Sequence, residues 1–361
     1  MNPLQLIPAA DPLQVPWGWF QIFLTATFLF HLIAMNLMLG GTLINFFRHV
    51  RGQYPADLLE DTAHKIPFSV AFAVNFGVAP LLFLQVLHGQ FIYTSSVLMA
   101  SFWLLIMPLL IAAYGTSYFY SFNFRCLSNW HTVISGLIAI LMLGVAFIFT
   151  CNLSLMLNPP AWTAYFERPE GLILNLSDPT LFPRFIHSVL GSIAVAGLGL
   201  ALWHDWQARR GNSDSAQLIP ADLRWFSGAT MLNFAFGFWY FGSLPEGVRS
   251  ASGFTGSLLI FFLLLGIATA ILALIAAGTL RVRATAFWTL LTLTAMVLVR
   301  ELVRSLLLNP WISTTEPAVT AFQYSPLFFF LLTLAGGLWL IWFIIRLVTS
   351  STQADTKEAR S

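Results

Sequence analysis

The chain contains very few charged residues. They make up 9% of its 361 residues, against roughly 25% in soluble domains, whereas hydrophobic residues make up 58%. No lysine or arginine precedes Arg48, and no aspartate or glutamate lies between Asp61 and Glu167. Each charge at the centre of a bilayer costs about 3 kcal/mol on insertion scales, so long uncharged stretches are typical of lipid-facing helices. The composition excludes a soluble domain and predicts an integral membrane protein.

Cysteine is also scarce. Cys126 and Cys151 are the only two, which is too few for a disulfide framework. Neither belongs to a C-x-x-C-H sequence, which excludes covalently attached heme c. No run of basic residues suggests a nucleic-acid partner, and no basic n-region precedes the first apolar segment. We therefore expect that segment to stay in the membrane.

Apolar segments of about 20 residues are long enough to cross a bilayer as helices. Nine such segments predict an all-α integral membrane domain over residues 1–349, followed by a disordered cytoplasmic tail over residues 350–361. The second and third segments are separated only by a short turn around Gly89 to Thr94. The nine segments lie near residues 17–47, 67–91, 95–121, 131–157, 183–206, 225–244, 255–279, 285–308 and 324–347.

The basic residues test this count through the positive-inside rule. With the N-terminus outside, twelve basic residues fall on the inner side and three on the outer side. The pattern predicts about nine helices with the C-terminus inside. The inner residues are Arg48, Arg51, Lys65, Arg125, Arg209, Arg210, Arg224, Arg281, Arg283, Arg346, Lys357 and Arg360, and the outer residues are Arg168, Arg184 and Arg249.

Charged residues deep in a predicted span are confined to the eighth segment. Arg300 and Arg304 are four residues apart and share a helix face, and Glu301 is three residues from Arg304 and can pair with it. One interpretation is a self-neutralised ion pair that fixes helix packing. The other is a heme site, in which arginines hold propionates and the carboxylate ligates iron or relays protons.

Three histidines, His31, His88 and His187, fall within spans toward the outer side. A lone membrane histidine is more often a hydrogen-bonding residue between helices than a ligand. Imidazole is nevertheless a common axial ligand of heme iron, so both interpretations stay open. Of the histidines at inner helix ends, solvated or headgroup roles are expected for His49, His64 and His204, and the role of His131 is left open.

Five segments, in order, resemble subunit I of the cytochrome bd oxidase family. Thr27–His31 resembles the T-x-x-x-H stretch that carries an axial histidine of the high-spin heme pair. Phe185–Val189 is similar to the F-[VI]-H-[ST]-V sequence that holds the low-spin heme histidine. The resemblance covers roughly residues 20–311. In the second segment, Gly77–Ala79 followed by Gly89 keeps the spacing of the family's GVA...FG segment. At the end of the fourth, Met156–Pro159 resembles the family's M-x-N-P. After the eighth, Asn309–Trp311 stands where the family has GRQPW.

The chain departs from the family pattern at several places. The long quinol-binding loop after the sixth helix is reduced to about a dozen residues around Leu244–Gly247, and Leu258–Leu265 lacks the ligand methionine. The third segment has no carboxylates for proton delivery, and Gln85 replaces a glutamate. The arginine of GRQPW is missing, and Glu301 lies one turn before the family's ligand position. We therefore expect a divergent, shortened branch of the family.

The resemblance implies two or three noncovalently bound hemes b near the outer face. For one of these hemes a chemically modified macrocycle stays an alternative. The resemblance also implies a respiratory oxidoreductase subunit in the cytoplasmic (inner) membrane of a prokaryote, working with a second membrane subunit. In this interpretation His187 and His88 are the two axial ligands of a low-spin heme, and His31 ligates a second heme. Glu301 ligates a third heme iron or relays protons. Arg300 and Arg304 neutralise the heme propionates.

The electron donor is expected to be a quinol or a periplasmic cytochrome c, and oxygen is one candidate acceptor. Two alternatives stay open at this point. The first is a heme electron conduit that does not reduce oxygen. The second is a transporter or structural membrane subunit without heme, in which the charges of the eighth segment bind substrate or only pack.

Overall fold

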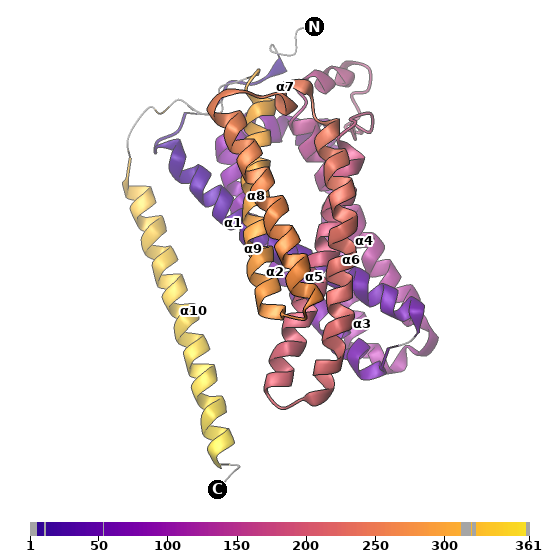
Figure 1. Ribbon diagram of the computed structural model, residues 1–361. Helices are drawn as coiled ribbons and strands as arrows, with labels where there is room; N and C mark the ends of the chain where they lie inside the picture. The colour runs from indigo at the N-terminus through magenta and orange to yellow at the C-terminus, as the bar shows by residue number, and fades with distance from the viewer. Residues whose placement is uncertain (1–5, 11, 53, 312–318, 320–322, 359–361) are drawn as a thin grey trace. The chain divides into compact units, whose positions relative to one another are not determined.

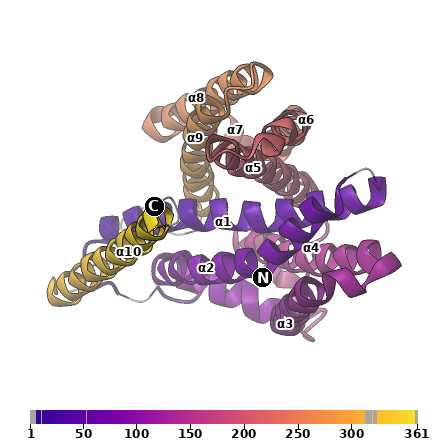
Figure 2. The ribbon, with the colours of Figure 1, turned by 90° about the horizontal axis from the view of Figure 1, so that it is seen from below.

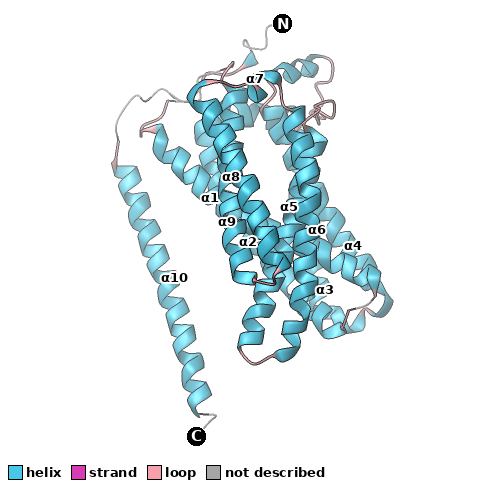
Figure 3. Cartoon of the chain, viewed as in Figure 1, coloured by secondary structure: helices cyan, strands magenta, loops and turns pink. Residues whose placement is uncertain are grey.

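The computed structural model describes residues 6–10, 12–52, 54–311, 319 and 323–358. Within these residues the protein is all-α, and the only β feature is an isolated bridge between Leu13 and Val319. Figure 3 shows the helices and the connections between them. The chain divides into two compact units. The first unit is Met1–Asp11 with Phe20–Glu316, and the second is Pro12–Trp19 with Pro317–Ser361.

The helices follow the predicted apolar segments. Ten α-helices are found in the described part of the chain, with three short 3-10 segments between them. The elements are α1 (Trp17–Arg51), α2 (Ala56–Leu98), α3 (Ala100–Asn123), η2 (Phe124–Cys126), η3 (Ser128–Trp130), α4 (His131–Met156), η4 (Pro159–Phe166), α5 (Leu181–Arg209), α6 (Ser213–Ser243), α7 (Glu246–Arg249), α8 (Gly253–Gly278), α9 (Val282–Leu308) and α10 (Ser325–Glu358).

Eight helices in the described residues are long and apolar enough to cross a membrane, namely α1 to α5, α8, α9 and α10. The prediction of a multi-pass, all-α membrane protein is therefore confirmed. α6 occupies the predicted sixth span but is not among the eight, because tryptophan, tyrosine, asparagine and glycine residues lower its mean hydropathy. It still exposes Met231, Leu232, Phe238 and Trp239, as a lipid-facing helix does.

Exposed apolar side chains also cover other helices of the first unit. On α3, Leu104, Met107, Ile111 and Phe122 are 65–79% exposed. A soluble protein rarely leaves such a large apolar surface in water. The exposed faces are therefore the surfaces that we expect acyl chains to cover.

Two groups of helices flank α1 in the first unit. Figure 2 shows α2, α3 and α4 on one side of α1, and α5, α6, α8 and α9 on the other. Within the groups, α2, α3 and α4 pack against one another, α5 pairs with α6, and α8 pairs with α9. Figure 1 places α7 at one end and the α5–α6 connection at the opposite end. We refer to these as the α7 end and the α5–α6 end.

Each group has its own apolar core. The first core joins α1 to α4 through residues such as Leu43, Ile66 and Ile138, and the second joins α5, α6, α8 and α9 through Leu198, Phe226 and other buried side chains. Burial of an aliphatic or phenylalanine side chain contributes about 1.5–3 kcal/mol in water, whereas in lipid the gain comes from close packing. The two cores fix the helices that carry the polar residues.

Two predicted boundaries differ from the structure. The chain is kinked at the non-helical His88, directly before the turn predicted from Gly89 to Thr94, but α2 then resumes and continues to Leu98, and the break before α3 falls at Met99. A single glycine costs a helix only about 1 kcal/mol, which packing of the neighbouring residues overcomes. At the C-terminus, α10 extends to Glu358 into the segment predicted to be a disordered tail, and residues 359–361 lie outside the described residues.

Candidate functional site

A buried ion-pair network joins α9 to α1 near the α7 end. Glu301 Oε1 accepts hydrogen bonds from Arg300 Nη1 at 2.9 Å and from Arg304 Nη2 at 2.5 Å. Its other oxygen, Oε2, accepts from Gln21 Nε2 of α1 at 2.9 Å. The side chains of Glu301 and Arg304 are only 11% and 5% exposed. The sequence predicted the three α9 residues to interact, but it did not indicate Gln21.

Positive charge exceeds negative charge around this network. Arg300 and Arg304 both pair with Glu301, and Arg184 of α5 lies near enough to Arg300 for the two charges to interact. The group therefore contains three guanidinium groups and one carboxylate. Arg184 Nε and Arg304 Nη1 are buried and have no hydrogen-bond acceptor among the described residues. We call Gln21, Arg184, Arg300, Glu301 and Arg304 the arginine cluster. Burying a charged donor without an acceptor is costly, so the cluster has the chemistry to bind an anion.

Arg184 is a residue that sequence reasoning placed only as an outer loop residue. It stands in the first turn of α5, three residues before His187, and residues at that spacing share a helix face. Its guanidinium lies 5.2 Å from the centre of the Tyr240 ring, and its Nη2 donates to Thr180 at 3.2 Å. The spacing to His187 was the signal that could have identified it.

His31 and His187 occupy equivalent local environments on different helix pairs. His31 Nδ1 on α1 is 3.1 Å from the carbonyl oxygen of Ala73 on α2. His187 Nδ1 on α5 is 3.4 Å from the carbonyl oxygen of Asn233 on α6. On α2 and on α6, the residue four positions after the one that supplies the carbonyl oxygen is a glycine, and the imidazole ring lies against it. The two glycines are Gly77, where an added Cβ would come 2.9 Å from His31 Cε1, and Gly237, where it would come 3.1 Å from His187 Cε1.

These contacts determine which ring nitrogen remains for other chemistry. A carbonyl oxygen can only accept a hydrogen bond, so Nδ1 of each histidine carries the hydrogen. In the neutral imidazole the lone pair then lies on Nε2. A histidine held through Nδ1–H by a backbone carbonyl is the usual arrangement of an imidazole that ligates a metal through Nε2. The contacts of His31 and His187 are therefore compatible with ligation of a metal through Nε2.

His88 lies at a break in α2. Its backbone angles are non-helical (φ −136°, ψ 31°), Gly89 follows it, and its side chain is 6% exposed. The charges of Arg304, Glu301 and Arg300 act on its ring. The structure thus brings His88 to the arginine cluster. His31 also lies near the cluster, because its ring is 6.3 Å from Phe28, over which Arg300 lies at 3.9 Å.

A second buried polar group lies toward the α5–α6 end. Asp222 of α6 accepts from Arg48 Nη2 of α1 at 2.5 Å, and its other oxygen lies 2.5 Å from His204 Nδ1 of α5. All three side chains are 0–2% exposed. We call these residues the Asp222 triad. The prediction of a solvated or headgroup role for His204 is wrong, because its side chain is buried and its hydrogen-bond partner lies on the neighbouring helix.

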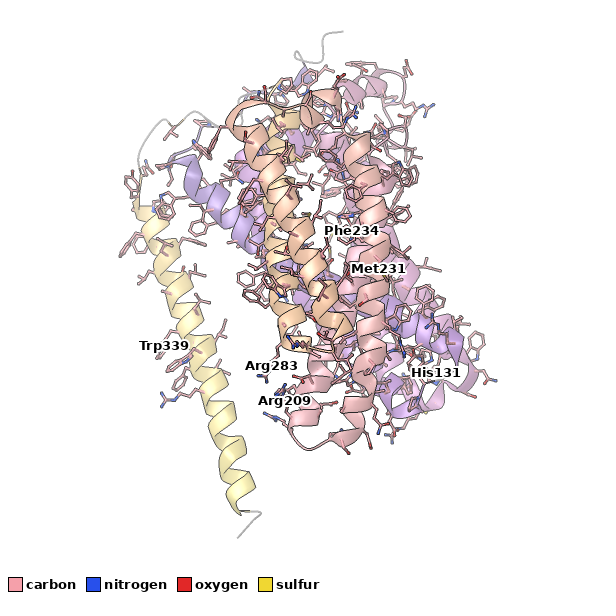
Figure 4. All side chains as sticks on the ribbon, in the orientation of Figure 1. His131, Arg209, Met231, Phe234, Arg283 and Trp339 are labelled. Atoms are coloured by element: carbon pink, nitrogen blue, oxygen red, sulfur yellow. The ribbon has the colours of Figure 1, made fainter. Side chains whose placement is uncertain are left out.

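The other histidines at this end also have protein partners. His49 Nε2 lies 2.5 Å from the buried Tyr120 hydroxyl, and its ring stacks on that of His131 at 5.2 Å. His64 Nδ1 lies 2.9 Å from the Ser121 hydroxyl, and half of the His64 side chain is exposed. Figure 4 shows His131 toward the same end as Arg209 and Arg283. His49 is thus held by α3 and α4 rather than solvated.

The described residues hold no group of three or more histidine, cysteine, aspartate or glutamate side chains that could bind a metal ion. Both cysteines are free. A heme needs only one or two axial ligands from the protein, because the porphyrin supplies the rest.

No protein-family model, curated protein or solved structure matches the chain. The class of the protein rests on the fold and the site alone. The protein is a multi-pass, all-α membrane protein. It carries two histidines held through Nδ1 and a buried cluster with an excess of positive charge.

Proposed function

We propose that the protein is the heme b-binding membrane subunit of a respiratory oxidoreductase that resembles subunit I of cytochrome bd oxidase. The observation that carries the proposal is the shared environment of His31 and His187. Each imidazole donates through Nδ1 to a backbone carbonyl and lies against a glycine of the next helix. This arrangement leaves Nε2 as the ligating atom in both.

The residues fit heme in charge as well as in ligand type. A heme supplies reversible one-electron chemistry at its iron, and it carries two propionate carboxylates. His187 would hold one heme iron and His31 another, with the buried His88 as the second axial ligand of the low-spin heme. Arg300 and Arg304 offer positive charge to propionates, and Arg304 Nη1 has no acceptor among the residues that the structure describes. Exposed apolar faces around the helices supply the low-dielectric surroundings of a membrane heme.

The hydrogen bonds that Glu301 accepts are evidence on the number of hemes that the protein binds. Both of its oxygens accept hydrogen bonds, from two arginines and a glutamine. A carboxylate that ligated a third iron would have to give up at least one of these bonds. This observation favours two hemes, with Glu301 as the counter-charge of the arginines, and it supports the alternative in which the subunit conducts electrons without reducing oxygen.

The remaining features of the proposal follow from the resemblance and the charge pattern. The N-terminus lies outside and the C-terminus inside the cytoplasmic membrane of a prokaryote, so the hemes lie toward the outer face. A periplasmic cytochrome c or a quinol donates electrons, and a second membrane subunit completes the complex. Oxygen uptake by the purified complex distinguishes a terminal oxidase from an electron conduit.

Histidine substitutions test the proposal directly. His187→Ala should remove the low-spin heme signal, and His31→Ala should remove the second heme, each leaving the other in place. His64→Ala is the matched control, because His64 lies near the opposite end of α2 from His88 and is half exposed. Heme content and reduced-minus-oxidised spectra of the purified variants give the result. Spectra unchanged in both variants would refute the ligand assignments.

A further inference from the structure

The arginine cluster has two buried donor atoms that nothing in the described chain satisfies. These atoms are Arg184 Nε on α5 and Arg304 Nη1 on α9. The third guanidinium, that of Arg300, donates to Glu301 and lies over the Phe28 ring. Three cations and one anion leave an excess of two positive charges. An excess of two charges in a low-dielectric site matches a ligand with two carboxylates.

The position of these donors indicates which heme they serve. Arg184 precedes His187 by three residues on α5, so the two side chains share a face and are separated by about 4.5 Å along the helix axis. α9, which carries Arg304, packs directly against α5. An iron ligand and two free guanidinium donors therefore lie on neighbouring helices near the same end of the bundle.

We infer that Arg184 and Arg304 bind the two propionates of the heme whose iron His187 ligates. The inference rests on the proposed function and assigns a binding role to Arg184. Arg304 divides its guanidinium between two tasks: Nη2 pairs with Glu301 and Nη1 binds a propionate. Glu301 pairs with Arg300 as well as with Arg304, and its Oε2 accepts from Gln21, which holds α9 to α1. A guanidinium is suited to this role because it stays charged in a dry site and forms directed bonds to carboxylates.

The test uses the full chain, purified in detergent with its heme. Arg184→Gln should lower the reduction potential of the His187 heme, because the removed positive charge stabilises the reduced form. We expect at least a tenfold shift in the reduction equilibrium, which is about 59 mV for one electron. Arg184→Lys should recover most of that shift. Arg168→Gln, in the exposed loop before α5, is the control and should leave the potential unchanged.

A second measurement begins with the unaltered protein, so that its first result does not depend on the folding of a variant. Heme-free protein is reconstituted with heme b or with its dimethyl ester, which lacks both negative charges. Heme b should bind at least tenfold more tightly than the ester, and Arg184→Gln should reduce that preference. Equal binding of the two, or a potential in Arg184→Gln equal to that of Arg168→Gln, would overturn the inference while the His187 ligand assignment stands.

Heme binding and stabilisation by inorganic phosphate together show whether the inference and the proposed function fail separately. If the protein binds no heme, the proposed function fails. If inorganic phosphate stabilises the heme-free chain against thermal unfolding and heme does not bind, Arg184 and Arg304 belong to a free-anion site and the inference fails as well. Binding of heme that depends on His187 and on both propionates supports both statements together.

Discussion

The arginine cluster and the Asp222 triad are both buried groups of charged side chains, but their charges are balanced differently. In the triad one aspartate lies between one arginine and one histidine, and each carboxylate oxygen has a partner. In the cluster three arginines accompany one glutamate, and two guanidinium nitrogens have no acceptor among the described residues. A balanced group needs nothing beyond the chain. We propose that a ligand completes the unbalanced group.

Arg48 in the triad also has two nitrogens without an acceptor among the described residues, so the two groups differ in charge balance and not in unpaired nitrogens. Arg48 and Arg184 each lie near a tyrosine ring, whose face attracts a cation, at 5.1 Å from Tyr54 and 5.2 Å from Tyr240. The triad joins α1, α5 and α6, so it links the central helix to the second helix group. We expect the triad to hold these helices together, whereas we propose that the arginine cluster binds a cofactor.

The largest expected effect is on the triad. Asp222→Asn leaves Arg48 buried without its counter-charge, and breaking a buried ion pair in this way costs about 3–5 kcal/mol. Thermal unfolding in detergent should show a large fall in stability. Asp205→Asn, which removes a partly exposed carboxylate near the same end, should change it little. Equal stability of the Asp222→Asn and Asp205→Asn proteins would show that the triad does not hold the helices.

A glycine substitution separates heme ligation from stability. Gly237→Ala places a Cβ 3.1 Å from His187 Cε1 and should displace the imidazole, at a cost of about 1–3 kcal/mol for overpacking. We expect the low-spin heme spectrum to be lost or altered. Gly228→Ala is the matched control on α6, because nothing lies within 4 Å of its added Cβ. A normal spectrum in Gly237→Ala would contradict the position assigned to His187.

The smallest effect is expected at Glu301. Glu301→Gln removes the negative charge of the cluster but no iron ligand, so heme content should stay at its original value. The reduction potential should rise, because the oxidised heme loses a favourable charge. Pyridine hemochrome assay and a redox titration measure the two quantities. Loss of one heme per chain would show that Glu301 is an iron ligand and that the cluster is catalytic.

The sequence predicted the helices well and the polar partners only in part. Apolar length alone located the spans, because the bilayer requires it. The partners of Arg48 and Gln21 could not be predicted, since Asp222 lies 174 positions after Arg48 and Glu301 lies 280 positions after Gln21. Such pairs depend on how the helices cross. The α9 ion pair was predicted because its members share one turn.

The spacing of residues along α5 also predicts a neighbour of His187. Arg184 and His187 are three residues apart, which places both on one face of α5. The glycines opposite His31 and His187 could not be recognised without the structure, because their meaning comes from rings on other helices. The same limit applies to His204, which is buried by a residue on the next helix.

The most direct test of the account is the heme content of the purified full chain, expressed with adequate heme supply and with any partner subunit. Pyridine hemochrome quantitation and a dithionite-reduced minus oxidised spectrum measure it. The account predicts sharp b-type bands and about two hemes per chain. A chain that folds, keeps its helices and contains no heme would contradict it and would leave the arginine cluster as a transport or packing site.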